Sequence, residues 1–483
     1  MPPPGNRTFA LAVVAAGQFL AVLSTSTVPV ALPAIGRDLD ASNAGLEWIV
    51  DAYVLVFASL LIPGGVLSDR RGRRRMFVVG VALFAAGSLV DGLAPSVGVL
   101  IGGRLLQGLG PAIVVPCSLA LISTLFQEPR ERAAALGIWS SGSGLALALG
   151  PTVGGVLVDA FGWRSVFLVN VLLSALLIAG ALRYIPYIRP ERGRFGFDWV
   201  GAVLTTAGVG ALAFAIIQGQ EAGWGSPAVV AVGVGGGVAL GAFVAWELHR
   251  PGPLVDVRLF RAPAFTAANV AGLVVFFAFV GAIVYFSAYF QQVQGRSATA
   301  AGLLILPVGV ALALTAPVSG RLTGRFGARW PMLIGLIVCG VATLGLLRLE
   351  PGSGPSAEWW DFALVGLGAG LALTPMTATA VGAVRHERSG MASAVHNAMR
   401  QLGQVLGVAV LGALVYAGLG GGAAGGRRLD AAGEHAFVDG LHDAMLVSGV
   451  ALLAAAAMVA VMVPRRRSNS NRPTFRGESR CTP

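Results

Sequence analysis

The sequence predicts an all-α polytopic membrane protein whose helices cross the bilayer fourteen times. Of its 483 residues, 55% are hydrophobic and 12% are charged, and the mean hydropathy is +0.76. A soluble domain carries about a quarter charged residues, so this chain cannot cover itself with polar surface. Fourteen apolar runs and a one-sided distribution of arginine give the number and the direction of the crossings.

The apolar runs are long enough to be transmembrane helices, which need about 20 residues each. The first run can also be interpreted as a signal peptide, but it is longer than a typical signal core and shows no clear cleavage site, so we expect a retained span. The predicted spans are 9–33, 47–68, 76–94, 98–122, 133–158, 163–184, 199–217, 227–247, 264–292, 298–320, 330–349, 360–382, 393–418 and 441–463.

The basic residues predict the orientation. All 34 are arginine; with a cytoplasmic N-terminus, 26 fall in cytoplasmic segments, 6 in outer loops, and Arg104 and Arg400 within spans. This bias follows the positive-inside rule. We therefore expect a bacterial inner-membrane protein with both termini in the cytoplasm, and we attribute the net charge of +11 to topology rather than to a nucleic-acid partner.

One segment is repeated inside the chain. Residues 65–74 return 255 positions later as 320–329, with Gly, Leu, Arg, Gly and Arg at matching offsets. Transporters are often built from repeated halves. Because the copies lie eight predicted spans apart, we expect two helices inserted between two six-helix halves. The predicted parts are an N-terminal half at 1–190, inserted helices and linkers at 191–262, a C-terminal half at 263–464 and a disordered basic cytoplasmic tail at 465–483.

Four motifs stand on the first five predicted spans. They are Trp48-Ile49-Val50-Asp51-Ala52-Tyr53 opening the second span, Gly65-x-x-x-Asp69-Arg70-x-Gly72-Arg73-Arg74 after it, Arg104-Leu105-Leu106-Gln107-Gly108-Leu109-Gly110 in the fourth, and Gly137 with Gly150-Pro151-Thr152-Val153-Gly154-Gly155 in the fifth. With these motifs the chain resembles the fourteen-span drug:proton antiporters (EmrB/QacA type) of the major facilitator superfamily over nearly its whole length.

The resemblance implies the major facilitator fold, two six-helix bundles plus two extra helices. It also implies export of a drug-like or secondary-metabolite compound in exchange for protons by alternating access. One departure is clear: the first span of the family usually carries an acid and an asparagine where this chain has Ser24 and Pro29. An uncoupled facilitator or importer of a small metabolite therefore remains an alternative.

Charged side chains inside a span are expensive and are functional candidates. We select Asp51, Arg104 and Arg400. Asp51 and Arg104 each lie roughly 6–9 Å below the outer boundary at about 1.5 Å per residue, so we expect them to meet. The hypothesis is that Asp51 carries the proton and Arg104 tunes it; the alternative is that Asp51 only caps a helix end.

Two motifs are expected to serve conformational change. The resemblance implies that Asp69 and its arginines tie the second span to neighbouring helices in one state, with Gly65 and Gly72 permitting close backbone approach. In the fifth span we expect Gly137, Gly150, Gly154 and Gly155 to let another helix pack closely, and Pro151 to remove a backbone donor.

Cargo contacts are less defined by the sequence. The aromatic residues of the ninth span either stack on a planar cargo or face lipid, and Arg400 with His396 is either a second charged site or a structural pair. The candidate cavity residues are Ser24, Phe276, Phe279, Phe286, Phe290, Asn269, Gln291, Asn397 and Arg400, and Gln107 and Gly108 accompany Arg104 in the fourth span.

Other functional classes find no support. A phosphate-binding loop ends in Gly-Lys-Ser/Thr, which a chain without lysine cannot form. The histidines show no HExxH or metal-ligand spacing. We therefore expect no catalytic activity, no metal and no cofactor. The expected partners are a small-molecule substrate, protons and the lipid bilayer, and we expect a monomer.

Overall fold

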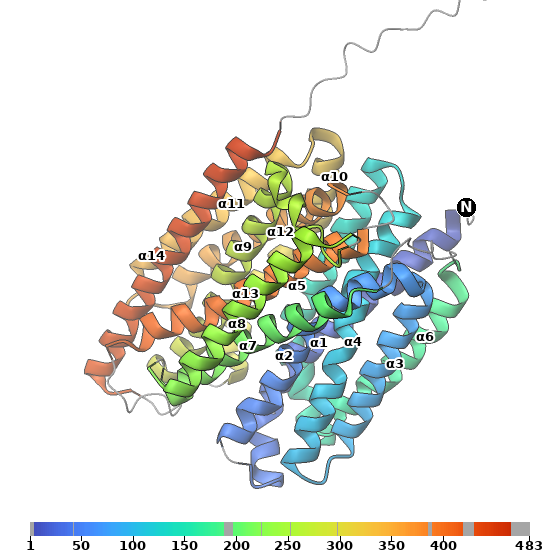
Figure 1. Cartoon of the computed structure of the whole chain (residues 1–483). Helices are drawn as coiled ribbons and strands as arrows, with labels where there is room; N and C mark the ends of the chain where they lie inside the picture. Colours follow the sequence, from blue (N-terminus) through green and yellow to red (C-terminus); the bar gives the residue numbers. More distant parts are fainter. Residues whose placement is uncertain are drawn as a thin grey trace, which may run out of the picture.

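The structure, a computed structural model, describes residues 4–41, 43–187, 197–223, 225–251, 253–296, 298–384, 389–418 and 429–464. The tail at 465–483 and the linker at 188–196 lie outside them. The described residues form fourteen α-helices and no strand (Figure 1). The helices are α1 (Pro4–Asp38), α2 (Asn43–Arg71), α3 (Arg73–Gly92), α4 (Val97–Leu125), α5 (Pro129–Phe161), α6 (Ser165–Tyr184), α7 (Trp199–Ala222), α8 (Pro227–His249), α9 (Pro263–Ala288), α10 (Ala298–Phe326), α11 (Arg329–Gly345), α12 (Pro355–Gly382), α13 (Ser389–Tyr416) and α14 (Ala431–Met462).

Each predicted span corresponds to one of these helices. Over the described residues, thirteen helices are long and apolar enough to cross a membrane. In α5 the side chains at positions 147, 148 and 151 are not described, and the uninterrupted apolar helix after them is Thr152–Phe161. The fold class predicted from hydropathy is confirmed.

The helices form two bundles with separate cores. Phe77, Phe84 and Trp139 are buried among the helices of the N-terminal bundle, and Phe286 and Phe437 among those of the C-terminal bundle. Helices α7 and α8, which the repeat predicts to be an insertion, pack on each other, and α7 contacts α2 and α13. They lie across the junction of the two bundles (Figure 1).

The internal repeat is a repeat of structure. Gly72 between α2 and α3 has φ of 94°, and Gly327 between α10 and α11 has φ of 86°. This left-handed region favours glycine because it has no Cβ. The two turns lie at the same end of the molecule as the start of α1 and the end of α14 (Figure 1). We call this the arginine-rich end, because Arg70, Arg71, Arg73, Arg74 and Arg75 lie there.

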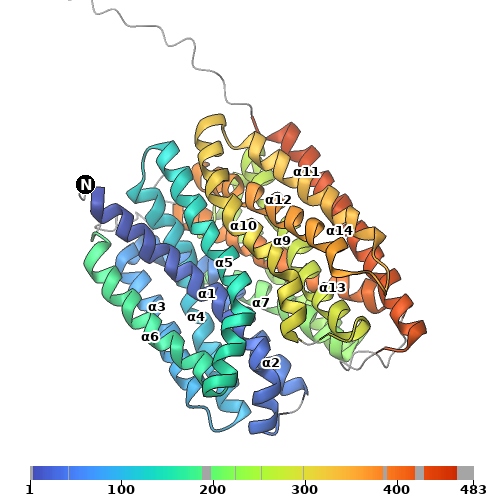
Figure 2. The same cartoon turned by 180° about the vertical axis from the view of Figure 1, so that it is seen from behind.

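Two seams join the bundles near this end. At the first, an added Cβ on Gly65 of α2 would stand 2.5 Å from Cβ of Ala394 of α13. At the second, Gly320 and Gly324 of α10 lie against Ala133 and Arg130 of α5. Figure 2 shows α5 beside α10 from behind. Each copy of the repeat thus packs on a helix of the opposite bundle.

Candidate functional site

Arg104 lies at the centre of a buried polar network in the N-terminal bundle. Its side chain is completely buried. Nε donates to the carbonyl of Ile49 at 2.8 Å, and Nη1 donates to Ser24 Oγ at 3.3 Å and to Gln107 Oε1. The guanidinium carbon lies 4.3 Å from the ring centroid of Tyr53. The network therefore draws on α1, α2 and α4.

Helix α3 supplies an acid to this network, Asp91. The side chain is completely buried, and neither carboxylate oxygen has a hydrogen-bond partner. Gly103 of α4 lies directly against the carboxylate, because a Cβ there would overlap Oδ1. Asp91 forms no hydrogen bond or ion pair with Arg104, but it lies against Gly103, the residue before that arginine, so the two opposite charges are neighbours. Gln107 extends the network by donating to Ser88 Oγ at 2.6 Å.

The expected contact between Asp51 and Arg104 is not formed. Asp51 is half-buried on α2, and no hydrogen bond or ion pair of the described residues includes it. Tyr53, whose ring faces Arg104, lies two residues further along α2, which is about 200° around the helix axis from Asp51 at 3.6 residues per turn. The acid on the α4 side of this network is Asp91, which lies against Gly103, the residue before Arg104.

The motif at the arginine-rich end joins the bundles. Asp69 accepts from Arg73 at 3.0 Å and from the backbone N–H of Met391 on α13 at 3.2 Å. Arg73 also donates to Ser389 Oγ of α13 at 2.9 Å and to the carbonyl of Ala120 at 3.0 Å. A network of charged hydrogen bonds thus closes the α2–α13 seam.

Two further arginines of this motif contact other partners. Arg70 lies over the ring of Phe197, 5.8 Å from its centroid, and Arg74 donates to the carbonyl of Leu182 at 2.7 Å.

Gly108 of the fourth-span motif lies at a close helix contact. A Cβ there would stand 2.7 Å from the carbonyl oxygen of Tyr53.

The glycines of α5 differ in what they face. A Cβ on Gly137 would stand 2.6 Å from the carbonyl oxygen of Ala316 on α10. Gly150 and Gly154 instead lie against α1, at Ser26 and Thr27. At Gly155 the prediction of close packing is wrong, because a Cβ there would meet no atom within 4 Å. The side chain of Pro151 lies outside the described residues.

The C-terminal bundle holds a second buried polar cluster. Arg400 and Asn397 of α13 are 6% and 5% exposed, and His396 and Asn269 are completely buried. Arg400 donates to Asn397 Oδ1 at 3.3 Å, and His396 Nε2 lies 3.3 Å from Thr377 Oγ1. The structure thus brings three predicted cavity residues and His396 together.

The sequence was compared with models of known protein families. The model of the Major Facilitator Superfamily matches residues 14–408. The chain belongs to the Major Facilitator Superfamily.

Relatives of this superfamily member include proteins named for resistance and export. It is 40% identical over 416 residues to the multidrug resistance protein Stp of Mycobacterium tuberculosis, covering 86% of this chain and 77% of that protein. It is 36% identical over 420 residues to the methylenomycin A resistance protein of Streptomyces coelicolor, covering 86% of each. The tetracenomycin C resistance and export protein of Streptomyces glaucescens is 34% identical over 410 residues, covering 85% and 76%.

Solved superfamily structures share the fold. The human organic anion transporter MFSD10 superposes with a TM-score of 0.70 at 15% identity, covering 95% of this chain and 100% of that one. The proton:xylose symporter XylE superposes with a TM-score of 0.67 at 14% identity, covering 96% and 97%. At these identities the likeness concerns the fold alone.

Three of the predicted aromatic residues of α9 are core residues in this superfamily member. Phe279, Phe286 and Phe290 are buried in the core of the C-terminal bundle. Phe286 and Phe290 contact the ring of Phe362 on α12, with centroids 4.9 and 6.1 Å apart. Burial excludes the lipid-facing orientation for these three residues, and contact with a cargo stays a prediction. Gln291 is exposed and donates to Ser287.

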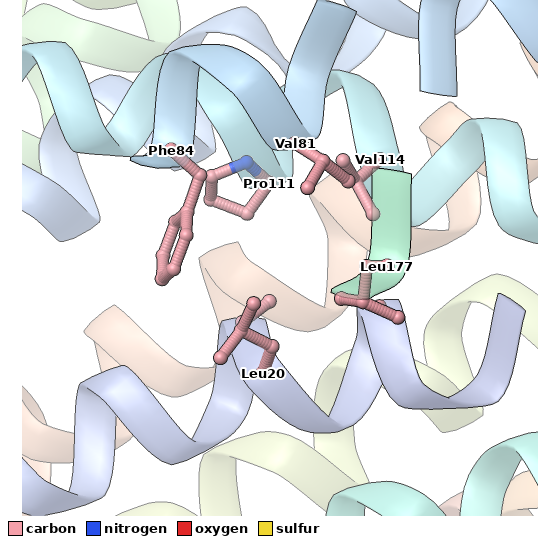
Figure 3. Close-up of a pocket in the computed structure, with 8 residues that line it drawn as sticks. Leu20, Val81, Phe84, Pro111, Val114 and Leu177 are labelled. Atoms are coloured by element: carbon pink, nitrogen blue, oxygen red, sulfur yellow. The ribbon is translucent and has the colours of Figure 1, made fainter. Parts of the chain in front are cut away.

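A small cavity lies inside the N-terminal bundle, among α1, α3, α4 and α6 (Figure 3). None of the predicted site residues lines it. Its walls are apolar, so they offer no group that holds a proton or a charged cargo. The lining residues are Gly17, Leu20, Ala21, Val81, Phe84, Pro111, Val114 and Leu177.

Sequence reasoning missed Asp91, although a signal was present. The predicted span 76–94 contains this one acid in an otherwise apolar run, close to its outer end. We selected charged residues inside spans but left out Asp91. Its partner Arg104 was identified, and Ser24, the residue at the departure from the family pattern, lies directly beside that arginine.

Proposed function

We propose that this superfamily member is a fourteen-span antiporter that exports a drug-like or secondary-metabolite compound from a bacterial cell in exchange for protons. The relatives described above, named for multidrug resistance, methylenomycin A resistance and tetracenomycin C resistance and export, support the class of cargo. We further propose that it works as a monomer with both termini in the cytoplasm, as the positive-inside bias of its arginines favours.

The observation that carries the proton-coupling proposal is the buried Asp91–Arg104 network. A nearby cation favours the ionised form of a carboxyl group, and burial favours its neutral form. A movement of α3 against α4 that changes the distance between Asp91 and Arg104 therefore changes the proton affinity of Asp91. Asp51, half-buried on α2, is the second candidate for a proton carrier.

The seams support alternating access. Hydrogen bonds from Arg73 and Met391 hold Asp69 at the arginine-rich end, and α5 packs on α10 at the same end. Opening a path toward this end requires breaking both contacts. Because the Asp69 network consists of a few hydrogen bonds at a helix end, it can break and re-form within a transport cycle.

The alternative is an uncoupled facilitator or importer. Ser24 in place of the acid of the first span favours it, because proton coupling then depends on carboxylates in α2 or α3. An efflux assay separates the two. Cells that overproduce the chain are loaded with varied antibiotics, and export is followed with and without a protonophore. Gradient-dependent export supports the antiporter, and export that the protonophore leaves unchanged refutes it.

A further inference from the structure

A buried cation without an acid lies in the C-terminal bundle. Arg400 donates to Asn397 Oδ1, its guanidinium carbon lies 4.2 Å from the ring centroid of Phe276, and its Nε has no hydrogen-bond partner. An arginine stays charged in proteins, and a buried charge without a counter-charge is costly. Arg400 is absent from the ion pairs of the described residues, which are Arg73–Asp69, Arg164–Asp38, Arg250–Asp198 and Arg348–Asp361.

A polar neighbour of Arg400 is also unsatisfied. Nδ1 of His396, one turn before Arg400 on α13, is buried and has no hydrogen-bond partner. His396 and Arg400 both lie against Gly272 of α9, where an added Cβ would stand 3.0 Å from the imidazole and 3.4 Å from Arg400 Cγ. Native proteins leave few buried polar atoms unpaired, so unpaired atoms around one cation indicate a missing anionic partner.

The N-terminal bundle shows the contrast. There the buried Arg104 donates to Ile49, Ser24 and Gln107, and a carboxylate, Asp91, lies against the preceding residue Gly103. The Arg400 cluster contains no carboxylate of the described chain. Arg400 and Asn397 keep a little exposure, and α13 packs against α2 and α4 of the other bundle. The unbalanced charge therefore lies on a helix that packs against both bundles.

We propose that Arg400 and His396 receive an acidic group of the cargo, so that this chain carries aromatic organic anions with a carboxylate. The inference rests on the proposed export function and names its substrate class. A guanidinium binds carboxylates with parallel hydrogen bonds, and the ring of Phe276 beside it offers a surface for an aromatic cargo to stack on.

Heat-unfolding of the purified protein in detergent tests this without any gradient. The probes are 1-naphthoate and 2-anthroate, each compared with its neutral amide of the same shape. In the unmodified chain we expect the acids to stabilise the protein against heat. Their apparent Kd should be at least tenfold lower than that of the amides. Arg400→Gln should raise the apparent Kd of the acids at least tenfold, to that of the amides, whereas Arg400→Lys should keep part of the preference.

Arg348→Gln, which removes an exposed arginine that follows α11 and pairs with Asp361 of α12, is the matched control and should keep the preference for acids. Equal apparent Kd values for acids and amides, or an unchanged acid affinity in the folded Arg400→Gln protein, would overturn the proposal. Because binding needs no proton gradient, a chain that binds the acids but exports nothing refutes the exporter and leaves the anion site standing.

Discussion

Asp91 and Asp51 carry the same carboxyl group in different surroundings. Neither carboxylate forms an ion pair with described residues; Asp91 is completely buried against Gly103, the residue before Arg104, whereas Asp51 is half-buried. Since coupling requires an acid whose environment changes with helix movement, the structure favours Asp91 for that role. The amide variants of the two residues form a matched pair.

We predict that Asp91→Asn lowers proton-coupled export at least tenfold, because the amide cannot carry the proton, while cargo binding is kept. A tenfold change corresponds to about 1.4 kcal/mol. The measurement is export from inverted vesicles at several imposed pH gradients, with Asp51→Asn as the comparison. If export by Asp91→Asn still depended fully on the pH gradient, Asp91 would be excluded as the proton carrier. Loss of this dependence in Asp51→Asn alone would assign the role to Asp51 of α2.

Replacement of Arg104 tests the other member of the network. We predict that Arg104→Lys lowers export at least tenfold, because one ammonium group cannot reach Ile49, Ser24 and Gln107 together as the guanidinium does. Transport in the same vesicles is the readout, and equal amounts of inserted protein are confirmed by immunoblot. Export at the unmodified level would show that the network is only structural.

At the scale of the helices, α5 offers a matched pair of glycines. Gly137 faces the backbone of Ala316 on α10, and Gly155 faces open space. We predict that Gly137→Leu abolishes export, because the larger side chain forces α5 and α10 apart at a cost of about 1–3 kcal/mol or more, whereas Gly155→Leu exports normally. Membrane insertion is checked by fractionation. Normal export by Gly137→Leu would refute a role for this contact.

Sequence reasoning succeeded and failed on these helices for physical reasons. Hydropathy determines where a helix can cross lipid, so each predicted span fell on a helix, with ends displaced by up to ten residues at the start of α14. It does not determine which way a side chain faces: Gly154 and Gly155 share a motif, yet they differ by about 100° around the helix axis, and only Gly154 meets α1. In the same way, Asp51 lies about 200° around α2 from Tyr53, whose ring faces Arg104.

At the scale of the whole molecule, the two bundles are in contact with each other at the arginine-rich end. A Cβ on Gly324 of α10 would lie 3.4 Å from Cβ of Arg130 of α5, close to the separation of about 3.5–4.5 Å found in disulfides. We predict that the pair Arg130→Cys and Gly324→Cys forms a disulfide on oxidation and blocks export until it is reduced. A change in gel mobility reports the link.

Single cysteine variants at the same two positions control for the substitutions themselves and should respond little to oxidant. Failure of the pair to crosslink would contradict the packing of α5 on α10. Full export by the crosslinked protein would show that the second seam does not open during transport, and the alternating-access account would then be wrong.

Proton exchange in a purified system tests the central claim most directly. The chain is reconstituted into liposomes that contain a pH-sensitive dye, a pH gradient is imposed, and the movement of an exported compound is followed together with internal pH. The account predicts that the compound moves against its concentration gradient while protons move the opposite way, and that Asp91→Asn abolishes both fluxes. Movement only down the compound's own gradient, without a change in internal pH, would contradict it.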